Sequence, residues 1–160
     1  MTIKIGDKLP DSKFMIPTID GPKPATTQEI FGSKKVALFA LPGAFTPTCS
    51  ARHLPSYIEK LAELKAKGID AIACTAVNDV FVMGAWAKDQ GIKGEIIMLA
   101  DGSANFAKAI GLDFDGSAFG MGIRSQRYGM VVDDGIVTHL FVEKGGEYKV
   151  SAAEYMLENI

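Results

Sequence analysis

Cys49 lies in a segment whose residue types favour a reactive thiol. The segment, Pro42 to Ser50, reads P-G-A-F-T-P-T-C-S. Helices accept proline at their first position, because an N–H would be unpaired there, so Pro47 predicts a helix start with Thr46 as its N-cap. Cys49 is then the third helical residue, where free backbone N–H groups and the helix dipole stabilise negative charge. A thiol in this position should ionise readily and act as a nucleophile.

Other kinds of chemistry at Cys49 have less support. The chain has two cysteines and no C-x-x-C motif, which excludes dithiol exchange within one motif. Cys49 and His53 would share a helix face and could bind a metal as a pair. Two histidines in the whole chain are too few for a full ligand set, so we predict no metal site. A cysteine hydrolase would need His139 at the sulfur, and nothing in the sequence brings it there.

Two more patterns have structural rather than chemical interpretations. Gly120-x-Gly122 precedes an apolar run, whereas a dinucleotide-binding fingerprint follows a strand and opens a helix, so we predict no cofactor. Asp133 and Asp134 stand directly before Gly135, between two apolar runs. They predict a tight hairpin turn rather than a catalytic pair of carboxylates.

These residues must be positioned by alternating strands and helices. Strands are predicted at Lys35–Leu41, Ile69–Val77, Glu95–Ala100, Tyr128–Val132 and Ile136–Val142. Helices are predicted from Leu54 to Gly68, from Asn78 or Asp79 to Gly91, from Ser103 to Ile110, and after a Ser151–Glu154 capping box. The Gly-, Pro- and Thr-rich stretch from Asp20 to Thr27 is interpreted as a surface loop. This order predicts an α/β protein whose mixed central sheet is flanked by helices, a thioredoxin-like fold with an N-terminal extension.

Size and composition exclude several classes of protein. A chain of 160 residues, 48% of them hydrophobic, fits one domain over residues 1–160. Seventeen basic and nineteen acidic residues give a net charge of −2, which offers no electrostatic attraction to nucleic acid or to an anionic membrane. The first residues contain no apolar secretion signal, and two cysteines cannot form a disulfide framework. We therefore expect a reduced, cytoplasmic protein.

Taken together, these residues resemble the peroxiredoxins, and they are most similar to the type II, atypical two-cysteine branch. The resemblance rests on Pro42 to Ser50 with His53-Leu54-Pro55 after it, on Cys74…Val77-Asn78-Asp79, and on Arg127-Tyr-Gly-Met-Val-Val132 before Asp134-Gly135. It implies a thioredoxin-like fold and a thiol-dependent peroxidase. Such an enzyme reduces hydrogen peroxide, small alkyl hydroperoxides and peroxynitrite with a cysteine, without a metal or prosthetic group.

The resemblance also implies roles for four residues. Cys49 would be the peroxidatic cysteine, which peroxide oxidises to a sulfenic acid. Thr46 would hydrogen-bond the peroxide and the thiolate, and Pro42 would shield the pocket from water. Arg127 would lie beside the sulfur. Arg124 is the competing arginine, but on an extended chain it points to the opposite face, and the family pattern places the arginine immediately before the apolar strand.

The chain departs from the family pattern near its C-terminal end. Animal members of the branch carry a resolving cysteine there, whereas this chain has none after Cys74, and Ser151 stands in about that region. Cys74 lies among small and apolar residues and is interpreted as an inert core residue. The Cys49 sulfenic acid is therefore expected to be reduced by glutathione with glutaredoxin, or by thioredoxin.

Two further questions stay open in the sequence. The alternative function is a thiol-disulfide transferase or a redox-sensing module on the same fold, with a non-catalytic chaperone-like protein third. Thr46 and Arg127 favour the peroxidase, because a thiol transferase needs no peroxide-binding threonine. The family commonly forms homodimers through the active-site edge, and Phe45, Phe81 and Phe119 in loop-like positions fit such an interface.

Overall fold

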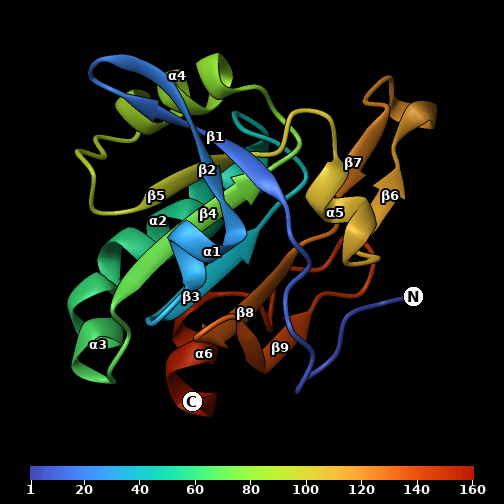
Figure 1. Ribbon diagram of the computed structural model, residues 1–160. Helices are drawn as coiled ribbons and strands as arrows, with labels where there is room; N and C mark the ends of the chain where they lie inside the picture. The colour runs from blue at the N-terminus through green and yellow to red at the C-terminus, as the bar shows by residue number, and fades with distance from the viewer.

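Seven strands form one mixed sheet at the centre of the molecule (Figure 1). The computed structural model describes residues 1–160. In sheet order the strands are β2 (Gly21–Thr26), β1 (Lys13–Thr18), β5 (Ile97–Ala100), β4 (Ala71–Ala76), β3 (Lys35–Ala40), β8 (Tyr128–Asp133) and β9 (Ile136–Val142). β3, β4 and β5 are parallel, and the other pairings are antiparallel. The prediction of a mixed sheet is confirmed.

Helices cover both faces of this sheet. They are α1 (Thr27–Phe31), η1 (Cys49–His53), α2 (Leu54–Glu59), α3 (Leu61–Ala66), α4 (Val80–Asp89), α5 (Asn105–Ala109), η2 (Ser117–Phe119) and α6 (Ala153–Asn159). A separate two-stranded sheet pairs β6 (Asp113–Asp115) with β7 (Ile123–Ser125). No helix has the length and apolar character that crossing a bilayer requires.

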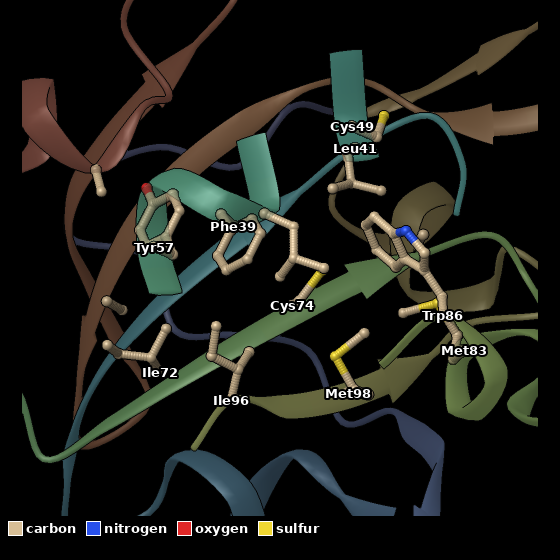
Figure 2. Packing of buried hydrophobic residues seen from close by; sticks show 14 of the residues in the cluster. Phe39, Leu41, Cys49, Tyr57, Ile72, Cys74, Met83, Trp86, Ile96 and Met98 are labelled. Atoms are coloured by element: carbon tan, nitrogen blue, oxygen red, sulfur yellow. The ribbon is translucent and has the colours of Figure 1, made fainter. Parts of the chain in front are cut away.

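The alternation of side chains along β3 creates two hydrophobic cores. Ala37, Phe39 and Leu41 pack with residues of η1, α2, α3, α4 and α6 on one face (Figure 2). Val36 and Leu38 point to the other face and pack with residues of α1, α5 and the N-terminal segment. Successive side chains of a strand point to opposite faces, so a continuously apolar strand must be buried on both sides.

The prediction of a surface loop from Asp20 to Thr27 is wrong. β2 occupies most of this stretch and pairs with β1 along its whole length, from Lys13↔Thr26 to Thr18↔Gly21. Its prolines, Pro22 and Pro24, suggested a loop because proline cannot donate to a sheet ladder. β2 is an edge strand, and proline is tolerated there because the outer side of the strand has no neighbouring strand that would need its N–H.

The predicted capping box at Ser151 is also wrong. α6 begins at Ala153, its N-cap is Ala152, and no side chain caps it. The Ser151 hydroxyl instead donates to Glu143 Oε2 at 2.6 Å, and the Ser151 amide donates to the same oxygen at 2.8 Å. Two hydrogen bonds to the Glu143 carboxylate hold Ser151 one residue before the N-cap, where it cannot form the predicted box.

Two other local predictions are confirmed. Asp79 caps α4, because its side chain accepts a hydrogen bond from the Val82 amide at 2.8 Å. Asp134 and Gly135 both have positive φ, 48° and 81°, in the two-residue turn that joins β8 to β9. Positive φ at both central residues is what a tight hairpin turn of this kind requires.

Candidate active site

Cys49 is reached by a short loop from the end of β3 and is fully buried. Helical structure begins at Pro47, as predicted, and Cys49 is the first residue of η1, where the Leu54 amide donates to the Cys49 carbonyl. Single π-helical turns of this kind occur frequently at functional sites. The Ala44 amide donates to Asn78 Oδ1 at 2.8 Å and fastens the loop to the segment before α4.

Thr46 precedes the helix, but its side chain does not cap it. The hydroxyl donates to the Gly43 carbonyl at 2.7 Å, and no hydrogen bond joins it to the Cys49 amide. The predicted side-chain cap is therefore wrong: the hydroxyl holds the loop through Gly43 and does not accept from the helix amides. With its proton used in this bond, the Thr46 oxygen keeps lone pairs that can accept a hydrogen bond from a bound O–H group.

Arg127 joins Cys49 to a second buried residue. Its Nη2 donates to Cys49 Sγ at 3.1 Å, and its Nη1 lies 2.9 Å from His53 Nδ1. Arg124 does not contact the sulfur: its Nε donates to the Met121 carbonyl at 2.8 Å, and its Nη1 donates to the carbonyls of Val77 at 3.1 Å and Pro42 at 3.5 Å. The structure thus brings Arg127 to the sulfur and uses Arg124 to tie surface loops together.

Pro42 and Arg127 line a cavity of about 490 Å³. Its other walls include apolar side chains, Phe114, Phe119 and Met121, and charged ones, Glu143 and Lys144. A larger cavity of about 870 Å³ lies between β1, α4 and β5, and no cysteine, histidine or carboxylate lines it. Size alone does not locate chemistry, so the smaller cavity, lined by Thr48 and by the arginine that contacts Cys49 Sγ, is the candidate active site.

His53 also belongs to this site, and the sequence did not predict its contacts with Arg127 and Ser151. It is fully buried, its Nε2 lies 3.1 Å from the Ser151 carbonyl oxygen, and Nδ1 faces Arg127. Burial, together with the adjacent Arg127 charge, lowers the pKa of His53 to about 3. The spacing of four residues from Cys49 was the available signal, but it suggested a metal pair. No third histidine, cysteine or carboxylate gathers around the two.

Cys74 is the other thiol, and it has different surroundings. It lies on β4, opposite Phe39 of β3, and is fully buried within the same core cluster (Figure 2). Burial, and then the nearby Cys49, raises the pKa of Cys74 well above its usual value. Both cysteines are free thiols. His139 lies on β9 beside Thr138, with no contact to either sulfur.

Comparisons with known proteins show the family of this chain. The Redoxin family model matches residues 4–157. Peroxiredoxin-2E, chloroplastic, of Arabidopsis thaliana is 47% identical over 161 residues, which cover 98% of this chain and 69% of that protein. Peroxiredoxin-2B of the same plant is 43% identical over 157 residues, 98% of this chain and 97% of that protein. The crystal structure of reduced Prx3 from Vibrio vulnificus in complex with hydrogen peroxide has a TM-score of 0.94, 50% identity, and 98% coverage of both chains.

The agreement extends over nearly the whole chain. It therefore confirms the predicted thioredoxin-like fold as well as the resemblance seen in the sequence. The Cys49 thiol beside Arg127, which lines the cavity, is the candidate site for the chemistry of this family. The chain belongs to the type II peroxiredoxins and is a thiol-dependent peroxidase.

Proposed function

We propose that Cys49 is the peroxidatic cysteine of this enzyme. Its thiolate attacks one oxygen of the peroxide, an S–O bond forms as the O–O bond breaks, and the leaving oxygen takes up a proton as water or an alcohol. Cys49 is left as a sulfenic acid. The observation that carries the proposal is the hydrogen bond of 3.1 Å from Arg127 Nη2 to Cys49 Sγ, beside an open cavity.

Arg127 and Thr46 have separate parts in this proposal. An ordinary thiol is a few per cent ionised at pH 7, so full ionisation gains at most about 30-fold in rate. The larger gain must come from donors that stabilise charge on the leaving oxygen, each worth roughly 2.7–4 kcal/mol. Arg127 is such a donor. The Thr46 oxygen, held by its bond to Gly43, accepts from the peroxide O–H and aligns the O–O bond.

Pro42 and the cavity walls suit small peroxides. Pro42 packs at the cavity next to Arg127 and shields the sulfur from water. The cavity has room for hydrogen peroxide, and the apolar side chains of Phe119 and Met121 suit the alkyl part of a small hydroperoxide. The expected kinetic result is reduction of both classes of peroxide, measured as peroxide consumed by the reduced protein in a single turnover.

The reductant that we propose is glutathione with glutaredoxin, or thioredoxin. Cys74 is buried on a strand and its raised pKa disfavours the thiolate, which supports an external thiol rather than Cys74 as the resolving group. Peroxide consumption with each system as the sole electron source tests this choice. The alternative, a thiol-disulfide transferase, predicts faster exchange with a small disulfide than with peroxide, which the same enzyme preparation can report.

The partner that we propose, besides peroxide and reductant, is a second copy of the chain. Phe45, Phe81 and Phe119 are 52%, 72% and 81% exposed. Phe45 lies in the loop after β3, but Phe81 lies in the first turn of α4 and Phe119 in η2, so the prediction of loop positions is wrong for these two. The bond from Ala44 to Asn78 fastens the Phe45 loop to the segment before α4. Exposed aromatic residues favour a protein interface where they lie close together. Light scattering should give twice the chain mass, and serine at all three positions should give the monomer.

We also propose a single domain over residues 1–160, working in the cytoplasm. One sheet runs through both cores, which supports a single cooperative unit and predicts one thermal transition. Two free thiols suit a compartment that keeps cysteines reduced. Two relatives are named as chloroplastic, so cell fractionation is the test of location.

A further inference from the structure

His53 lies between Arg127 and the chain that leads into α6. Its Nδ1 is 2.9 Å from Arg127 Nη1, and its Nε2 is 3.1 Å from the Ser151 carbonyl oxygen. Tyr148 closes the same group from outside, with its ring centroid 5.2 Å from that of His53 and 5.8 Å from the Arg127 guanidinium carbon. Nothing in the proposed peroxide chemistry uses His53 directly.

The two contacts of His53 agree on one tautomer. A guanidinium only donates hydrogen bonds, so Nδ1 must accept from Arg127. A carbonyl oxygen only accepts, so Nε2 must carry the proton and donate to Ser151. A doubly protonated ring would present a proton to Arg127 and lose this bond. The fully buried, neutral ring therefore gives Arg127 a fixed acceptor.

The Ser151 carbonyl is itself held in place. It accepts from the Tyr57 hydroxyl at 2.8 Å as well as from His53. Glu143 Oε2 accepts from both the amide and the hydroxyl of Ser151, at 2.8 Å and 2.6 Å. Glu143 also donates through its amide to the Arg127 carbonyl at 3.0 Å. A continuous run of hydrogen bonds thus joins Glu143 to the sulfur through Ser151, His53 and Arg127.

We propose that His53 is a positioning residue for peroxide reduction, which acts through Arg127. By occupying Nη1, it fixes the guanidinium plane so that Nη2 points at Cys49 Sγ and at the peroxide oxygens beside it. A planar, forked donor depends on its orientation as well as its charge. A displacement of about 1 Å in such a group can cost 10²-fold in rate. The inference rests on the proposed role of Arg127.

Two substitutions separate the two contacts of the ring. In His53→Asn the amide oxygen can take the place of Nδ1 and accept from Arg127, while the bond to Ser151 is lost. In His53→Gln the amide nitrogen can take the place of Nε2 and donate to Ser151, while Arg127 loses its acceptor. His139→Gln, on β9, is the matched control for histidine loss. Thermal melts establish that each variant is folded.

The measurement compares two reactions of Cys49. Peroxide reduction requires an aligned donor, whereas alkylation by iodoacetamide requires only the thiolate. For His53→Gln we expect peroxide reduction to slow at least about tenfold, with alkylation at pH 8 within about threefold of wild type, because the Arg127 charge stays. For His53→Asn we expect both rates within about threefold of wild type, since Arg127 keeps an acceptor.

Other outcomes would overturn the inference. A His53→Gln variant that reduces peroxide as fast as wild type shows that Arg127 needs no acceptor at Nη1. Equal losses in His53→Gln and His53→Asn, or a parallel loss of alkylation, show that His53 only supports the fold. Cys49→Ser and Arg127→Ala in the same assay test the proposed function separately: if both are inactive while His53→Gln is not, only the inference on His53 fails.

Discussion

Cys49 and Cys74 are both fully buried in one core cluster, yet their surroundings differ in kind. Cys49 begins a π-helical turn and accepts a hydrogen bond from a guanidinium that borders a cavity. Cys74 lies mid-strand, among apolar side chains, and burial raises its pKa. Burial alone therefore does not distinguish the two thiols. In our proposal, the charged donor and the access of substrate do.

The largest expected effect comes from exchanging the two sulfurs for oxygen. Cys49→Ser should abolish peroxide reduction, because a hydroxyl is a far weaker nucleophile at neutral pH. Cys74→Ser should keep most of the activity, with some loss of stability from a hydroxyl on a buried strand. Steady-state peroxide consumption with excess reductant measures both. If Cys74→Ser is as inactive as Cys49→Ser, the contrast between the two thiols is lost.

Arg127→Lys tests whether charge or shape distinguishes the Cys49 region. Lysine keeps the positive charge but not the planar fork, so peroxide reduction should slow by about 10²-fold while iodoacetamide alkylation of Cys49 stays near normal. Stopped-flow mixing with peroxide gives the first rate. Arg124→Lys is the matched control, because Arg124 bonds only to backbone carbonyls. If Arg127→Lys reduces peroxide at a near-normal rate while Arg124→Lys is slow, the role belongs to Arg124 and our assignment of Arg127 is wrong.

Thr46→Val sharpens the same comparison on the substrate side. The change removes the oxygen that we propose accepts from peroxide and also its bond to Gly43. We expect the rate of peroxide reduction to fall by roughly 10²-fold. The free energy of unfolding should fall by only about 1 kcal/mol. Thr46→Ser keeps the hydroxyl and should restore most of the rate. Equal, modest losses in both variants would make Thr46 a structural residue only.

Glu143→Gln tests the hydrogen bonds that hold Ser151 and, through His53, Arg127. The quantity measured is the pH dependence of stability. Burial opposes ionisation of Glu143, but hydrogen bonds from Ser151 and Lys149 outweigh it and lower its pKa. A lowered folded-state pKa stabilises the fold above the unfolded value of about 4.3, and this stabilisation disappears as the pH falls through the folded value. Wild type should therefore exceed the variant in stability at pH 7, by a margin that shrinks in acid. Urea unfolding at several pH values measures the margin, and a constant one would contradict the assignment.

The smallest effect is expected at Tyr128, in the other core. Its hydroxyl is buried and has no hydrogen-bond partner, and burial raises its pKa. Tyr128→Phe removes an unsatisfied polar group, so the protein should be unchanged or more stable by about 1 kcal/mol. Peroxide reduction should stay at the wild-type rate. Clear destabilisation in urea would show that the hydroxyl has a partner, such as a buried water.

Short-range patterns explain why much of this molecule was predictable from sequence. Pro47 marks the helix start, Asp79 caps α4, and Asp134-Gly135 forms the hairpin turn, because each depends on residues only a few positions apart. The apolar run of β3 predicted a buried strand in the same way. The same local signals predicted Cys49 as the peroxidatic residue, and that assignment stays a prediction.

Long-range partners explain the errors. The carbonyl that His53 contacts lies 98 residues along the chain, so a helix pattern around His53 could not reveal it. Ser151 follows the capping-box pattern, but Glu143, eight residues away, takes its hydroxyl. The direction of the Thr46 hydroxyl depends on a loop that folds back onto Gly43. The strand β2 was not predicted because it contains prolines. Proline is tolerated in a strand at the edge of a sheet, and the sequence alone does not show which strands lie at an edge.

Mapping the first oxidation product tests most directly whether Cys49, and not Cys74, reacts with peroxide. The reduced protein is mixed with one equivalent of hydrogen peroxide, trapped with a reagent selective for sulfenic acids, digested, and analysed by mass spectrometry. The trapped adduct should lie on Cys49, with Cys74 recovered as an unmodified thiol. An adduct on Cys74, or a disulfide between Cys49 and Cys74 as the main product, would contradict the account.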